Sequence, residues 1–129
     1  MSSTPRPRVL YVDDHEDSRE MLSTLLRFAL IEAKAVGTAA EALSSIQTEH
    51  FDLYLLDSQL PDLDGFELCR RMRDLDGHTP ILFFSGAAFK TDKQRGIEAG
   101  ANDYISKPDI ESLIGSIRQF VFQAQSAAA

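Results

Sequence analysis

The sequence contains a single cysteine, Cys69, and no tryptophan. A lone cysteine excludes an intrachain disulfide and fits a reducing compartment such as the cytoplasm, where this thiol is expected to pack as a small apolar group. No apolar stretch is long enough to span a membrane. The first residues, MSSTPRPR, also lack the apolar core of a signal peptide. Basic residues are fewer than acidic ones, 13 against 20, and the net charge of −7 disfavours direct nucleic-acid binding, which needs a basic face.

The length and composition predict one globular domain. The chain has 129 residues, of which 43% are hydrophobic, and a chain of this size buries enough surface for one core. No repeat, low-complexity tract or linker divides it. We expect a flexible N-terminal segment over residues 1–7, a folded domain over 8–124 and a frayed tail over 125–129.

Apolar runs of strand length alternate with segments of helical period along the whole domain. The predicted strands cover residues 9–12, 33–36, 51–56, 80–85 and 102–106. A helix is predicted after each strand, with Thr38 and Asp64 as N-terminal caps of the second and third helices and Gly100 as the stop of the fourth. Five units of this kind predict an α/β fold, a doubly wound parallel sheet of five strands with helices on both faces.

Polar residues follow four of the predicted strands at their carboxyl ends. They are Asp13 and Asp14 after the first strand, Asp57 after the third, Ser85 at the end of the fourth and Lys107 after the fifth. Ligands of open α/β sheets bind in the crevice beyond the carboxyl ends of the strands. We therefore expect these side chains to meet at one edge of the sheet.

Each of these residues also has a simpler explanation when it is considered alone. Asp13 and Asp14 are compatible with helix capping, since acidic groups favour the start of a helix. Asp57 is compatible with an ordinary turn residue, and Lys107 with a surface charge. Neither capping nor turn formation predicts acids, a hydroxyl and a lysine at four strand ends in this order, so the combination favours a functional site.

In these positions the chain resembles the receiver (CheY-like) domain of two-component response regulators. The matching segments are VDD at 12–14, LLDSQLPDLDG at 55–65, FFSGAA at 83–88 and AGANDYISKP at 99–108. Each segment alone is weakly diagnostic, but their order and spacing over about residues 8–122 are specific. The resemblance implies a flavodoxin-like sheet with strand order 2-1-3-4-5, and a cis peptide bond between Lys107 and Pro108.

The resemblance also implies a phosphoryl-accepting site. Asp57 would be phosphorylated by a sensor histidine kinase or a histidine phosphotransfer protein, and Ser85 and Lys107 would contact the phosphoryl oxygens. Mg²⁺ (or Mn²⁺) would bind Asp14, Asp57 and the backbone carbonyl of Gln59, with Asp13 acting through water. The residues support this, because three carboxylates would repel an incoming phosphate unless a metal with oxygen ligands neutralised them.

Further residues would control switching and the lifetime of the aspartyl phosphate. Ser85 would move towards the phosphoryl group and Tyr104 inward, changing the face of the fourth helix, fifth strand and fifth helix. That face would bind a downstream target or effector domain, or form a weak dimer of an otherwise monomeric protein. Gln59 and Ala87 occupy positions that tune the lifetime in this family, and Ser58 is small where the family often has a larger residue.

Three other functions are compatible with parts of the sequence but fit it less well. A phosphohydrolase of the haloacid dehalogenase type typically needs a second aspartate where Gln59 stands, and a flavin mononucleotide carrier would not place the acids of DDHEDS at its phosphate site. A protein-interaction module that works without phosphorylation remains the main alternative. We expect no enzymatic activity beyond the domain's own phosphorylation and dephosphorylation. The receiver is expected either to act alone or to be part of a longer protein.

Overall fold

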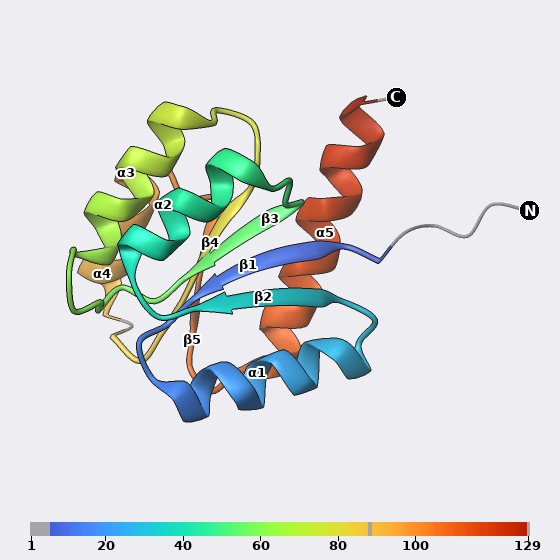
Figure 1. The fold of residues 1–129 in the computed structure, drawn as a ribbon, viewed down its shortest axis with the longest axis horizontal. Helices are drawn as coiled ribbons and strands as arrows, with labels where there is room; N and C mark the ends of the chain where they lie inside the picture. Colours follow the sequence, from blue (N-terminus) through green and yellow to red (C-terminus); the bar gives the residue numbers. More distant parts are fainter. Residues whose placement is uncertain (1–5, 88, 129) are drawn as a thin grey trace, which may run out of the picture.

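The computed structural model describes residues 6–87 and 89–128, with side chains described as far as residue 123. Five parallel strands form one sheet in the order β2-β1-β3-β4-β5, and a helix follows each strand. Figure 1 shows the helices lying on both sides of this sheet. The predicted fold class and strand order are therefore confirmed.

The elements follow the predicted alternation closely. The strands are β1 (Arg8–Val12), β2 (Glu32–Val36), β3 (Leu53–Leu56), β4 (Ile81–Ser85) and β5 (Asp103–Ser106). The helices are α1 (Glu16–Phe28), α2 (Ala39–Thr48), α3 (Gly65–Leu75), α4 (Lys90–Glu98) and α5 (Ile110–Ala128). Among the described residues, no helix combines the length and the apolar character needed to cross a membrane.

The central strands are buried on both faces because their side chains alternate between two cores. In β1, Leu10 and Val12 point into the core on one side, whereas Val9 and Tyr11 point into the core on the other. Helices α2 and α3 cover the first core, and α1 and α5 cover the second. This alternation fixes which side chains reach each face at the carboxyl ends of the strands.

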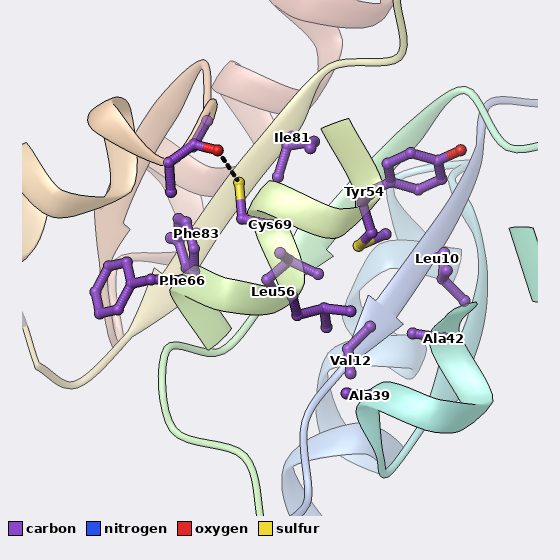
Figure 2. Packing of buried hydrophobic residues seen from close by; sticks show 14 of the residues in the cluster. Leu10, Val12, Ala39, Ala42, Tyr54, Leu56, Phe66, Cys69, Ile81 and Phe83 are labelled. Carbon is purple, nitrogen blue, oxygen red and sulfur yellow. Dashed lines mark hydrogen bonds between the residues drawn. The ribbon is translucent and has the colours of Figure 1, made fainter. Parts of the chain in front are cut away.

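The core on the α2–α3 side contains the single cysteine. Figure 2 shows Cys69 on α3 among apolar side chains, with its thiol donating a hydrogen bond of 3.5 Å to the carbonyl of Ala99. Burial raises the pKa of this thiol to about 11, which keeps it protonated and unreactive at neutral pH. Cys69 thus packs as the sequence predicts.

The strand boundaries differ by one or two residues from those predicted, and a backbone turn ends the first helix. Helix α1 ends at Phe28, because Leu30 has a φ of +64°, a left-handed conformation that a right-handed helix does not contain. Strand β3 begins at Leu53 rather than at residue 51, and the Asp52 carboxylate accepts a hydrogen bond from the Arg8 backbone N–H at 2.7 Å.

The two predicted terminal segments fall at the limits of the described chain. Most of the N-terminal segment 1–7 lies outside the described residues. Helix α5 continues through residues 125–128, where the sequence predicts a frayed tail. Alanine and glutamine, which make up most of this stretch, are good helix formers.

The turn between α3 and β4 is organised by the carboxylate of Asp76. It accepts hydrogen bonds from the Tyr54 hydroxyl at 2.9 Å, the His78 N–H at 2.9 Å, and the N–H and hydroxyl of Thr79 at 3.1 and 2.5 Å. Burial alone would raise the pKa of Asp76, but these donors hold the pKa well below its ordinary value of 3.8. The charged carboxylate therefore stabilises this turn.

Replacing Asp76 with asparagine is expected to lower the free energy of unfolding by about 2 kcal/mol at neutral pH, because charge-assisted hydrogen bonds are lost. The folded-state pKa lies below the unfolded value, so the stabilisation is present above about pH 4 and is lost as the pH falls through the folded-state pKa. Urea denaturation between pH 7 and pH 3 measures this. Asp74→Asn, exposed near the end of α3, is the matched control. A difference that does not shrink at low pH would contradict the assignment.

Candidate functional site

The strand register brings the predicted site residues together at one edge of the sheet. Val12 pairs with Leu56, and the ladder continues one residue further, where the Asp57 N–H donates to the Val12 carbonyl at 3.0 Å. On the other side, the Lys107 N–H donates to the Ser85 carbonyl at 3.0 Å. Asp13, Asp57, Ser85 and Lys107 thus lie at the carboxyl ends of neighbouring strands, as predicted from the sequence.

Asp13 is a fully buried carboxylate whose oxygens are both engaged. Its Oδ2 accepts from the Tyr11 hydroxyl at 2.5 Å and from the Lys107 amine at 2.9 Å, and its Oδ1 accepts from the His15 N–H at 3.0 Å. Burial opposes ionisation, yet these donors hold the pKa of Asp13 below its ordinary value. Asp13 does not cap α1, since its Oδ1 binds His15, the residue that precedes the first helical turn.

Lys107 joins the two buried carboxylates. Its amine lies 2.9 Å from Asp13 Oδ2 and 3.2 Å from Asp57 Oδ2. Burial alone would lower the pKa of Lys107, but its hydrogen bond to Asp13 and the charges of Asp57 and Asp13 raise the pKa above its ordinary value. The amine is therefore a fixed positive charge within reach of Asp57. The peptide bond between Lys107 and Pro108 is cis, as the resemblance implied.

Asp57 is buried, and its other oxygen meets two different donors. Asp57 Oδ1 accepts from the Gln59 N–H at 3.1 Å and lies 3.3 Å from the Ser85 hydroxyl. The Ser85 oxygen accepts in turn from the Ala87 N–H at 3.2 Å and lies 2.7 Å from the Ser58 hydroxyl oxygen. The contact with Gln59 is that of a turn residue, so the simpler explanation of Asp57 is compatible with its position in this cluster.

Asp14 differs from Asp13 because its side chain is 34% exposed. One of its oxygens lies 3.0 Å from His15 Nδ1. Asp13, Asp14, His15 and Asp57 each offer a ligand atom, and these atoms lie within 4.8 Å of one another. The set is mainly carboxylate oxygen, which is the donor type that Mg²⁺ prefers. The residues present therefore fit a divalent cation, with Asp14 as the accessible carboxylate of the acidic pair.

Tyr104 is buried in the core on the α2–α3 side of the sheet. Its ring is stacked on Phe83 with the centroids 5.3 Å apart, and its hydroxyl donates to the backbone carbonyl of Ala87. A Cβ at Gly96 would come within 3.0 Å of the Tyr104 ring, so the missing side chain lets α4 lie close to β5. The aromatic that the resemblance expects to move inward already occupies an inward position here.

The structure shows three contacts of the site that the sequence did not predict, made by Tyr11, Ser58 and Gly65. Tyr11 lies two residues before Asp13 and hence on the same face of the extended chain, so the strand period contained a signal for their contact. Ser58 contacts Ser85 across the edge of the sheet. Gly65 starts α3 so close to β3 that an added Cβ would lie 2.3 Å from the Asp57 carbonyl oxygen. No local sequence signal predicts either of these last two contacts.

Comparison with known proteins supports the same family. A family model described as the response regulator receiver domain matches residues 9–118. The DNA-binding response regulator MtrA of Mycolicibacterium smegmatis is 36% identical over 105 residues, which are 81% of this chain and 46% of that protein. The transcriptional regulatory protein GltR of Pseudomonas aeruginosa is 34% identical over 120 residues, 91% of this chain and 50% of that protein. The chain thus spans about half the length of these curated relatives.

Solved structures of similar fold cover nearly the whole chain. A CheY-like response regulator receiver domain protein from Methanospirillum hungatei superposes with a TM-score of 0.88 at 29% identity, over 95% of this chain and 98% of that one. The receiver domain of Francisella response regulator 1452 gives a TM-score of 0.86 at 28% identity, over 92% and 98% of the two chains. Both are similar in extent to the folded domain described above.

Proposed function

Because the chain belongs to the family of response regulator receiver domains, we propose that it accepts a phosphoryl group on Asp57 from a sensor histidine kinase or a histidine phosphotransfer protein. The observation that carries this proposal is the setting of Asp57. Its buried carboxylate lies 3.2 Å from the Lys107 amine and 3.3 Å from the Ser85 hydroxyl, next to the acidic pair Asp13 and Asp14. Phosphoryl transfer to an aspartate needs a nucleophile, a positive charge and a hydroxyl donor, and this setting provides all three.

In the proposed reaction, an Asp57 carboxylate oxygen attacks the phosphorus atom of a phosphohistidine. The new bond joins this oxygen to phosphorus, and the bond between phosphorus and the histidine nitrogen breaks. The electron pair remains on that nitrogen, which takes up a proton from water. Lys107 and Ser85 hold phosphoryl oxygens by hydrogen bonds while charge develops on them. Hydrolysis of the acyl phosphate later restores the carboxylate, with Gln59 and Ala87 setting how water approaches.

A divalent cation, Mg²⁺ or Mn²⁺, is proposed as the cofactor of this reaction. Asp14, Asp57 and the backbone carbonyl of Gln59 would hold it, with Asp13 contributing through water because both its oxygens already accept hydrogen bonds. When bound, the cation supplies neutralisation of the negative charge shared by the carboxylates and the phosphoryl group.

The proposed output is a change in the surface formed by α4, β5 and α5. After phosphorylation the Ser85 hydroxyl donates to a phosphoryl oxygen, and the ring of Tyr104 is favoured in the inward position found here over an outward one. This surface binds a downstream target or effector domain in the cytoplasm. The protein itself is proposed to be a monomer, or a weak dimer formed through the same surface. Two longer relatives are named as DNA-binding and transcriptional regulators, but the acidic receiver itself is proposed to make no direct nucleic-acid or membrane contact.

The decisive experiment is intact mass spectrometry after incubation with acetyl phosphate and Mg²⁺. We expect the mass of one phosphoryl group to be added, to be lost on alkaline treatment, and to be absent in Asp57→Asn, which keeps the shape of the side chain. The absence of an adduct in the parent protein would favour a module that interacts without phosphorylation. An adduct that persists in Asp57→Asn would place the phosphoryl group elsewhere.

A further inference from the structure

We propose that Ser58 is a positioning residue that directs the hydroxyl proton of Ser85 towards Asp57; this rests on the function proposed above. The two hydroxyl oxygens lie 2.7 Å apart, and both serines are buried, with 6% and 1% of their surfaces exposed. Among the described residues, Ser85 is the one hydrogen-bond partner found for the Ser58 side chain. Ser58 itself does not hydrogen-bond to the Asp57 carboxylate, so any influence it has on that group passes through Ser85.

The direction of the hydrogen bonds follows from counting donors and acceptors. A serine hydroxyl donates once and accepts up to twice. The Ser85 oxygen accepts from the Ala87 N–H at 3.2 Å, and it faces Asp57 Oδ1, which in the ionised state only accepts. If Ser85 donated to Ser58, its oxygen would face the buried carboxylate with no proton between them. The favourable order is therefore Ser58 to Ser85 to Asp57, which satisfies every site on Ser85.

The backbone holds Ser58 in place for this role. The Gly65 N–H donates to the Ser58 carbonyl at 3.1 Å, and the Ser58 Cα lies only 2.7 Å from where a Cβ on Gly65 would stand. The start of α3 thus presses against the residue that follows the phosphoacceptor. Ser58 and the Ala87 N–H both contact the Ser85 oxygen, which leaves the Ser85 proton free to turn from Asp57 to a phosphoryl oxygen.

The test is a double-mutant cycle on the rate of phosphorylation by acetyl phosphate, followed by mass spectrometry. Ser58→Ala is expected to lower the rate about 5- to 10-fold, the effect of losing one positioning hydrogen bond. The same change in a Ser85→Ala background is expected to alter the rate less than about 2-fold, because its partner is already gone. The Mg²⁺ concentration that gives the half-maximal rate should stay unchanged, a result that general distortion of the site would not give. Ser44→Ala, an exposed serine of α2, is the control.

Each outcome bears on one of the two proposals. Equal slowing by Ser58→Ala in both backgrounds, or an unchanged rate in the parent background, overturns the positioning role and leaves Asp57 phosphorylation standing. A raised Mg²⁺ requirement overturns it as well, because Ser58 would then act on the metal site. If the parent protein takes up no phosphoryl group at all, the proposed function fails and the role of Ser58 fails with it.

Discussion

Replacing Asp14 with alanine is expected to abolish Mg²⁺-dependent phosphorylation, with a loss of more than about 100-fold in rate. Removing a group that merely supports a metal ligand already costs 10- to 100-fold in affinity or activity, so loss of a ligand costs more. Asp13 offers no substitute, because it is fully buried and its oxygens already accept from Tyr11, Lys107 and the His15 N–H. Asp14 is the exposed carboxylate of the pair and lies within 4.8 Å of the Asp57 ligand atom.

The control for this change is Asp17→Ala, three residues further along the chain. Asp17 lies exposed in the first turn of α1, where the helix dipole stabilises a negative side chain. It is not part of the carboxylate cluster. Phosphorylation by acetyl phosphate should therefore stay nearly intact in this variant at every Mg²⁺ concentration. Comparable losses of phosphorylation rate in the two variants would mean that the negative charge near α1 in general, rather than a metal ligand at Asp14, supports the reaction.

The fold and the main site residues were predictable because they rest on local patterns. Apolar runs such as residues 81–85 mark strands buried on both faces, and the alternation with helices favours a parallel sheet. Once the strands are parallel, residues that follow them, such as Asp57 and Lys107, must meet at one edge. Proximity of these groups therefore follows from chain connectivity alone.

The contacts that refine the site were not predictable in the same way. Which oxygen of Asp13 faces Lys107, and whether Ser58 reaches Ser85, depends on side-chain rotamers and on how closely neighbouring elements approach. The inward position of Tyr104 depends on how closely α4 packs at Gly96. This approach depends on the surfaces of α4 and of the strands together, not on either sequence segment alone. From the sequence alone, glycine at position 96 indicates only a low helix propensity. The structure shows that it leaves room for an aromatic ring.

Gly65→Ala is expected to lower the free energy of unfolding by at least about 3 kcal/mol, at the upper end of the cost of overpacking. The added Cβ would lie 2.3 Å from the Asp57 carbonyl oxygen and 2.7 Å from the Ser58 Cα. Both neighbours are backbone atoms, so no side chain can rotate to make room. The start of α3 must move away from β3, which also displaces the phosphoacceptor and its neighbour.

Gly115→Ala provides the matched control for this prediction. Gly115 is exposed on α5, and a Cβ built there meets nothing within 4 Å among the described residues. The same chemical change should therefore raise the free energy of unfolding by about 0.5–1 kcal/mol, because alanine favours a helix interior over glycine. Urea denaturation measures both variants, and the phosphorylation rate should fall only in Gly65→Ala. If Gly65→Ala unfolds at the parent's urea concentration, α3 does not press against the Asp57 backbone as described.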